Sequence, residues 1–278
     1  MTTENEDRCF APIGVFDSGV GGLTVVREIM RQIPNERIIY FGDTARLPYG
    51  SKSKETITRY ARQIIRFLQT KQVKAIVVAC NTASAYALDE IEKDIDIPML
   101  GVVKPGARAA SKATKNGKIG VIGTEGTIGS HIYSHYIHET SPHTTVLGKA
   151  CPLFVPLVEE GLLQDSVTDE IAMRYLTALI HSDVDTLILG CTHYPLIRET
   201  IAKIMGEKVT LVNPAYETAR ELKELLQQEK LLHNGLKKQD KDPYQFYVSD
   251  AADKFQIFAN SILEHGGLSA QTINIEQY

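Results

Sequence analysis

One pattern occurs twice in this chain, and it limits the fold more than any other feature. Residues 73–85 contain a short apolar run that ends at Cys80, and residues 184–196 contain another that ends at Cys191. Small polar residues follow the cysteine in both places. A short apolar run that meets a turn before a helix is typical of a buried strand in a parallel sheet. We therefore expect two strands that each have a cysteine at the carboxyl end.

Each of these strands is preceded, at a similar distance, by another apolar run that enters a turn. The preceding runs are IGVFD at 13–17 and IGVIG at 119–123, and the spacing from glycine to cysteine is 66 residues (14 to 80) and 71 residues (120 to 191). Repeated strand–turn–helix units predict the α/β class. We expect two pseudo-symmetric α/β domains with mainly parallel sheets, and an active site in the cleft between them.

The domain limits follow from this repeat, because no low-complexity segment or long linker separates the two halves. The chain is then expected to cross between the domains at least twice. The first domain is predicted to contain residues 1–97 plus 210–278 and to carry Cys80. The second is predicted to contain residues 98–209 and to carry Cys191.

Composition excludes several classes of protein. At 278 residues the chain suits about two domains of ~150 residues each. A net charge of −4 gives no reason to expect a nucleic-acid partner, and the apolar runs are shorter than the ~20 residues of a membrane helix. The polar, acidic residues 1–10 resemble no targeting peptide and are interpreted as a short disordered lead-in. We therefore expect a cytoplasmic protein whose four cysteines are reduced thiols.

The remaining elements follow from apolar periodicity and from turn residues. A glycine-rich turn at 18–22 is expected to present polar groups at the end of the first strand, and residues 151–161, with two prolines, are expected to form a rigid loop. Residues 232–242 are expected to form an exposed loop. Strands are predicted at 13–17, 37–41, 75–79, 97–103, 118–122, 186–189, 208–212 and, as the last strand, 245–249; helices are predicted at 23–33, 54–68, 82–91, 104–113, 169–180, 195–205, 217–232 and 252–263.

Two isolated cysteines support some chemistries better than others. A redox dithiol usually has both cysteines in one CxxC turn, and a structural zinc site needs closely spaced ligand pairs, which are missing here. The i,i+4 pair His131 and His135 has no third ligand nearby in the sequence, so we predict no metal site. A cysteine hydrolase could use Cys191 with His193 as its base, but Cys80 would then have no role.

The repeat favours a use for both thiols. Inverting a carbon centre requires a base on one face and an acid on the other, and twin domains can supply one thiol each. A thiol is mostly protonated at pH 7, so the thiol that acts as base must be activated. Asp17 beside Cys80, and His193 or Glu159 beside Cys191, are the candidate activating groups.

Five stretches of the chain closely resemble the motifs of glutamate racemases, which belong to the aspartate/glutamate racemase family. They are IGVFDSGVGGLTV, GDTARLPYGSKS, ACNTAS, CPLFVPLVEEG and GCTHYP, and the resemblance extends from about residue 13 to residue 218. It implies two α/β domains, the first completed by the C-terminal part of the chain. It also implies a racemase that needs no cofactor and interconverts L- and D-glutamate for the bacterial cell wall.

The resemblance also implies roles for individual residues. Cys80 and Cys191 match the acid/base pair, and Glu159 matches a glutamate that assists the second cysteine. The segment 212–215 (VNPA) departs from the family pattern, which usually has an Asp-Ser pair there. Cys9 and Cys151 match no catalytic position and are predicted to be structural. The residues that match the substrate-binding set are Asp17, Ser18, Tyr49, Gly50, Asn81, Thr82, Thr192 and His193.

Alternatives to this interpretation remain open at the level of sequence. An aspartate or hydantoin racemase would share the two-cysteine plan, and a hydrolase or decarboxylase that uses Cys191 alone would not need Cys80. A regulatory binding protein is a third class, although no surface patch in the sequence indicates one. The partner expected is a small-molecule substrate, glutamate, with no nucleic acid and no membrane. The sequence does not decide whether the protein forms a homodimer.

Overall fold

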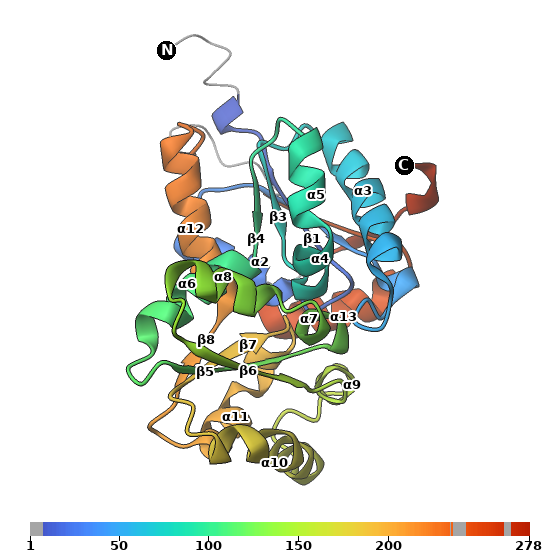
Figure 1. Cartoon of the computed structure of the whole chain (residues 1–278). Coiled ribbons are helices and arrows are strands. Elements are labelled where there is room, and N and C mark those ends of the chain that lie inside the picture. The colour runs from blue at the N-terminus through green and yellow to red at the C-terminus, as the bar shows by residue number, and fades with distance from the viewer. Residues whose placement is uncertain (1–7, 234, 236–242, 264–267) are drawn as a thin grey trace.

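The computed structural model describes residues 8–233, 235, 243–263 and 268–278, and it contains two parallel sheets (Figure 1). The first sheet has the strand order β10-β9-β2-β1-β3-β4, and the second has the order β6-β5-β7-β8. Every strand pair in both sheets is parallel. The α/β class and the two parallel sheets predicted from the sequence are confirmed. The strands of the first sheet are β1 (Ile13–Asp17), β2 (Ile38–Gly42), β3 (Ala75–Val78), β4 (Met99–Gly101), β9 (Tyr244–Val248) and β10 (Ala270–Thr272); those of the second are β5 (Lys118–Gly123), β6 (Thr145–Ala150), β7 (Thr186–Gly190) and β8 (Thr210–Val212).

The two sheets repeat one topology. In the first sheet the order β2-β1-β3-β4 corresponds strand for strand to β6-β5-β7-β8 in the second. The predicted pseudo-symmetry is therefore present in the strand order, and β3 and β7 occupy equivalent positions. Strands β9 and β10 extend only the first sheet, next to β2.

Helices cover both faces of each sheet and join the parallel strands, as they must in this class of fold. The long helix α3 shows how the sequence forms them: the Ser53 hydroxyl accepts a hydrogen bond from the backbone N–H of Thr56, and apolar residues at a 3.6-residue period are buried. The helices are α2 (Leu23–Gln32), α3 (Lys54–Thr70), α4 (Asn81–Tyr86), α5 (Leu88–Ile91), α6 (Val103–Ala113), α7 (Glu125–Gly129), α8 (Ile132–Thr140), α9 (Phe154–Glu159), α10 (Ser166–His181), α11 (Arg198–Met205), α12 (Pro214–Gln228) and α13 (Ala252–Leu263), with short 3₁₀ turns η1 (Thr44–Arg46), η2 (Glu92–Asp94), η3 (Tyr194–Ile197) and η4 (Ile275–Gln277).

The apolar core is divided into clusters on the faces of the two sheets. Two clusters belong to the first sheet, one facing α2, α12 and α13 and the other facing α3 to α5. Two more belong to the second sheet, one facing α9 to α11 and the other facing α6 and α8. Each domain therefore has its own core, and polar groups remain at the carboxyl ends of the strands, where the two domains face each other.

The sheets divide the chain slightly differently from the predicted domain limits. Strand β4, at 99–101, pairs with β3 in the first sheet, and β8, at 210–212, pairs with β7 in the second. The chain therefore leaves the first sheet after Gly101 and the second after Val212, rather than at 97/98 and 209/210. The cause is that both short strands extend a sheet at its edge, and sequence alone does not say which sheet an edge strand joins.

Three local predictions need correction. Residues 151–161 do not form only a loop, because Phe154–Glu159 is helix α9; Pro156 is tolerated in its first turn, where a backbone N–H has no partner within the helix. Strand β6 was missed because its residues are exposed or half-buried and lack an apolar pattern. Strand 245–249 is not the last, since the short, largely exposed edge strand β10 follows it.

The segment 212–215, which departs from the family pattern, forms a regular helix start. Asn213 is the N-cap of α12, its side-chain oxygen accepts a hydrogen bond from the Ala215 backbone N–H at 3.1 Å, and Pro214 occupies the first helical position. The predicted lead-in at 1–10 and the predicted loop at 232–242 lie largely outside the described residues. In the part of the chain that the structure describes, no helix has the length and apolar character needed to span a membrane.

Candidate active site

The two motif cysteines lie at equivalent ends of equivalent strands. Cys80 follows β3 and is the N-cap residue of α4, and Cys191 follows β7 just before η3. Each residue is only 6% exposed. The parallel strands of each sheet bring the polar residues of neighbouring loops to the same edge, so each thiol has charged or polar neighbours.

Cys191 is part of a three-residue polar chain. Its Sγ lies 3.7 Å from His193 Nδ1, and His193 Nε2 lies 2.9 Å from Glu159 Oε1 at the end of α9. Burial lowers the pKa of His193, but the hydrogen bonds and negative charges of Cys191 and Glu159 outweigh burial and raise this pKa to about 10. The imidazole is thus held as a cation beside the Cys191 thiol.

Cys80 has a different environment. Its thiol donates a hydrogen bond to the Ser18 hydroxyl at 3.8 Å, and Asp17 lies nearby at the end of β1. Burial, together with the negative charge of Asp17, raises the pKa of Cys80 to about 12. Cys80 is therefore held as a neutral thiol.

Asp17 is a fully buried carboxylate. Burial raises its pKa, whereas the positive charge of His193 and nearby backbone N–H groups oppose that rise. Its Oδ2 accepts a hydrogen bond from the Gly19 N–H at 3.1 Å, but Oδ1 has no hydrogen-bond partner among the described residues. A buried carboxylate oxygen without a partner is costly, and a cationic group of a ligand would satisfy it.

The glycine-rich turn of the first domain presses directly on the second domain. A Cβ on Gly21 would lie 2.3 Å from Thr192 Oγ1 and 2.5 Å from His193 Nδ1, so only glycine fits there. The Thr24 hydroxyl donates a hydrogen bond to the Thr192 backbone oxygen at 2.9 Å. The turn therefore allows a close approach between the two walls of the site, which are the ends of the first-sheet strands near Cys80 and of the second-sheet strands near Cys191.

Three more contacts join the two domains next to Cys80. The Thr82 hydroxyl lies 2.9 Å from that of Thr124 and 3.2 Å from that of Thr127, both in the second domain. The Tyr133 hydroxyl, from α8, donates a hydrogen bond to Asn81 Oδ1 at 2.7 Å. The residues that follow Cys80 are thus held by side chains from the opposite domain.

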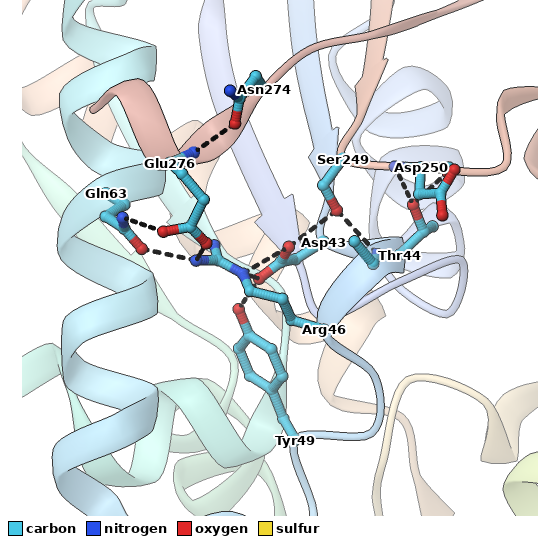
Figure 2. A network of polar contacts seen from close by, with 10 residues as sticks. Asp43, Thr44, Arg46, Tyr49, Gln63, Ser249, Asp250, Asn274 and Glu276 are labelled. Carbon is cyan, nitrogen blue, oxygen red and sulfur yellow. Dashed lines mark hydrogen bonds and ion pairs between the residues drawn. The ribbon is translucent and has the colours of Figure 1, made fainter.

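Tyr49 acts through its side chain and Gly50 through its backbone. Figure 2 shows the Tyr49 hydroxyl directed at Asp43, to which it donates a hydrogen bond. Arg46 Nε donates to both oxygens of this carboxylate, at 3.0 and 2.7 Å, and Arg46 also pairs with Glu276 near the C-terminus at 3.0 Å. The Gly50 backbone oxygen accepts a hydrogen bond from the Gly126 N–H at 2.8 Å. The Tyr49 side chain therefore supports the loop, and Gly50 forms part of the junction between the domains.

The other candidates lie apart from this site. Cys151 is buried and its thiol faces the Lys149 backbone oxygen at 3.5 Å, and the Cys9 thiol faces the Lys230 backbone oxygen at 3.2 Å. His135 pairs with Glu139 on the exposed face of α8. Within the described residues, no group of three or more His, Cys, Asp or Glu side chains is arranged to hold a metal ion.

Some residues of the site were not found from the sequence. Thr24, Thr124, Thr127 and Tyr133 all make contacts across the two walls, yet none belongs to a motif that carries chemistry by itself. Thr24 lies two residues after the glycine-rich turn at 18–22 and within the stretch IGVFDSGVGGLTV, which was a usable signal. Tyr133 lies among the histidines of residues 131–143, whose spacing bears only on metal binding.

Comparison with known proteins identifies the family of this chain. Residues 13–222 match the family model described as Asp/Glu/Hydantoin racemase. The chain therefore belongs to this family and is an amino-acid racemase, an isomerase.

More specific likenesses lie within the family. A protein from Geobacter metallireducens named glutamate racemase is 49% identical over 251 residues, which cover 90% of this chain and 92% of that protein. The crystal structure of glutamate racemase isoform RacE1 from Bacillus anthracis has a TM-score of 0.90 at 42% identity and covers 95% of this chain and 97% of that one. The Francisella tularensis glutamate racemase, solved in complex with D-glutamate, has a TM-score of 0.88 at 39% identity and covers 97% and 100%.

Proposed function

We propose that this protein interconverts L- and D-glutamate by proton transfer at Cα between two thiols, Cys80 and Cys191, without a cofactor. One observation carries the proposal: the thiols end equivalent strands of two sheets with the same topology. The glutamate-racemase names of the relatives support the choice of substrate.

In the L-to-D direction the thiolate of Cys191 removes the Cα proton, and the electron pair of that bond moves toward the α-carboxylate. The thiol of Cys80 then donates its proton to the opposite face of the carbon. The charged His193 stabilises the thiolate before the reaction, and Glu159 holds His193 in its charged form. After one turnover the two cysteines have exchanged protonation states, which is the starting state for the reverse reaction.

The substrate is held by polar groups of both walls. Asp17 binds the ammonium group, because its unpartnered Oδ1 lies in the neighbourhood of Cys80. An ammonium beside Asp17 also neutralises the charge that raises the pKa of Cys80, so this thiol becomes easier to ionise when substrate is bound. The carboxylates are bound by Ser18, Asn81, Thr82 and Thr192 and by the backbone N–H of Gly50.

The biological role proposed is supply of D-glutamate for peptidoglycan in the cytoplasm. This role follows from the resemblance to glutamate racemases and from the presence of D-glutamate among the reaction products.

The test is exchange of the Cα proton in D₂O, measured with each enantiomer of glutamate and of aspartate. We expect both glutamate enantiomers to racemise with incorporation of deuterium. Aspartate turned over at a higher kcat/KM than glutamate would replace glutamate as the substrate. Activity without deuterium incorporation would refute proton transfer at Cα.

The roles of the two thiols are tested separately. Cys80→Ser and Cys191→Ser should each abolish net racemisation, because a serine hydroxyl is a much weaker base. A substrate with a β-leaving group needs only one base, so Cys80→Ser should favour elimination from the L-form and Cys191→Ser from the D-form. Near wild-type racemisation by either variant would refute the two-thiol mechanism and favour a reaction that uses only the other cysteine.

A further inference from the structure

Tyr133 lies between the two cysteine walls and touches both. Its ring packs against the end of β7, since a Cβ on Gly190, the residue before Cys191, would lie 3.2 Å from Tyr133 Cε2. Its hydroxyl crosses to the first domain and donates to Asn81, the residue after Cys80, at 2.7 Å. The tyrosine is 3% exposed and Asn81 is 4% exposed, so this hydrogen bond is shielded from water.

The chemistry of the bond determines how the Asn81 amide is oriented. Burial and the negative charge of Cys191 raise the pKa of Tyr133, so its hydroxyl keeps its proton. With Oδ1 bound to this hydroxyl, the NH₂ group of Asn81 points the other way, and the only side-chain hydrogen bond of Asn81 among the described residues is the one to Tyr133. Asn81 also lines a small cavity together with Cys191 and Thr192. The side chain of Asn81 thus lies beside Cys191, on the residue that directly follows Cys80.

We infer that Tyr133 is a positioning residue for the racemisation: its hydroxyl fixes the Asn81 amide so that Nδ2 donates to the α-carboxylate of the substrate between the two thiols. The inference rests on the proposed function, because it assigns the Asn81 donor to the carboxylate of that substrate. Without the hydroxyl, the amide can rotate and present its oxygen, which repels a carboxylate. Tyr133 itself touches no substrate.

The helix that carries Tyr133 offers a matched control. Tyr136, one turn further along α8, also sends its hydroxyl across to the first domain, where it donates to Asp89 at 2.8 Å. Tyr136→Phe therefore removes the same chemical group from the same interface, but the partner of this hydroxyl, Asp89, is not a residue of the candidate site. A purely structural role in domain docking predicts the same effect for both tyrosines.

The experiment is a double-mutant cycle with Tyr133→Phe, Asn81→Ala and the double variant, with Tyr136→Phe as the control. Thermal unfolding and racemisation of glutamate are measured for each full-length protein. We expect Tyr133→Phe to lower kcat/KM about tenfold, mainly through KM, because one hydrogen bond that aims a donor at a charged group is lost. Tyr136→Phe should stay within about twofold of the wild type. In the Asn81→Ala background, Tyr133→Phe should cost nothing further.

Four results would overturn the inference. Effects that multiply in the double variant mean that Tyr133 does not act through Asn81. Equal losses in Tyr133→Phe and Tyr136→Phe mean that both tyrosines only hold the domains together. A lower kcat with an unchanged KM means that the Tyr133 hydroxyl does not act by helping Asn81 to bind the carboxylate of the substrate. A wild-type protein that does not racemise glutamate overturns the proposed function first, and this inference with it.

Discussion

Replacing Gly21 by alanine tests whether the two walls meet during the reaction. The added Cβ would lie 2.3 Å from Thr192 Oγ1, whereas ordinary contacts begin at 3.4 Å, so the walls must separate by about 1 Å. The neighbouring His193 ring cannot turn aside freely, because hydrogen bonds hold both of its nitrogens.

The expected loss is larger in activity than in stability. Overpacking of this kind costs about 1–3 kcal/mol, and part of it is relieved when the domains move apart. A displacement of about 1 Å at reacting groups can lower the rate about 100-fold. We therefore expect Gly21→Ala to reduce kcat/KM for glutamate about 100-fold and to lower the unfolding free energy by no more than about 2 kcal/mol.

The assay is racemisation followed by circular dichroism, together with denaturant unfolding of the same samples. Gly129→Ala is the matched control, because its Cβ would have no atom within 4 Å. This control should keep wild-type kcat/KM and gain up to about 1 kcal/mol of stability. If Gly21→Ala is as active as the control, the walls do not need this contact and the closed geometry is not the reactive one.

Three further predictions concern charge, stability and metals. Glu159→Gln removes one of the groups that raise the pKa of His193. In the wild type the charged His193 and its stabilising effect are fully present below pH 6.5 and are lost as the pH rises through about 10. In the variant, the alkaline limb of the pH profile of L-to-D kcat/KM should therefore move to lower pH. Lys74→Ala should cost about 3–5 kcal/mol in denaturant unfolding and leave KM unchanged, because it leaves the carboxylate of Glu36, 2.5 Å from Lys74 Nζ, buried without its partner at the end of the sheet away from the thiols. Activity should survive treatment with EDTA and should not respond to added pyridoxal phosphate; loss on chelation with recovery on adding metal would contradict a reaction carried by thiols alone.

The sequence predicted the central strands of the two sheets better than the edge strands. Apolar runs that end at Cys80 and Cys191 identify the central strands, because a strand buried on both faces has a continuous apolar pattern. The edge strands β6 and β10 have little burial to mark them, so their residues look like loops. The edge strands β4 and β8 were found, but their assignment to a sheet depends on contacts between distant segments.

The sequence predicted which residues form the candidate site, but not the hydrogen bonds that they make. Asp17, Ser18 and Cys80 gather at one wall, and Cys191, His193 and Glu159 at the other, as neighbouring strand ends would require. What the sequence could not predict is the hydrogen bonding between walls, because the tyrosine and threonine side chains involved are common in any protein. The direction of the Tyr49 hydroxyl likewise depends on the buried Asp43, whose position is known only in the folded chain.

The strand order of the first sheet has a consequence for synthesis on the ribosome. Strand β2 needs β9 as its outer neighbour, yet about 200 residues separate Gly42 from Tyr244. At about 5–20 residues per second, the edge of β2 waits on the order of tens of seconds for its partner. Strands β5 to β8, in contrast, lie in one continuous segment, so the domain that begins later in the chain can finish folding first. A chaperone that shields exposed strand edges would then act on the first half of the nascent chain, and ribosome stalling before residue 244 would leave that half protease-sensitive.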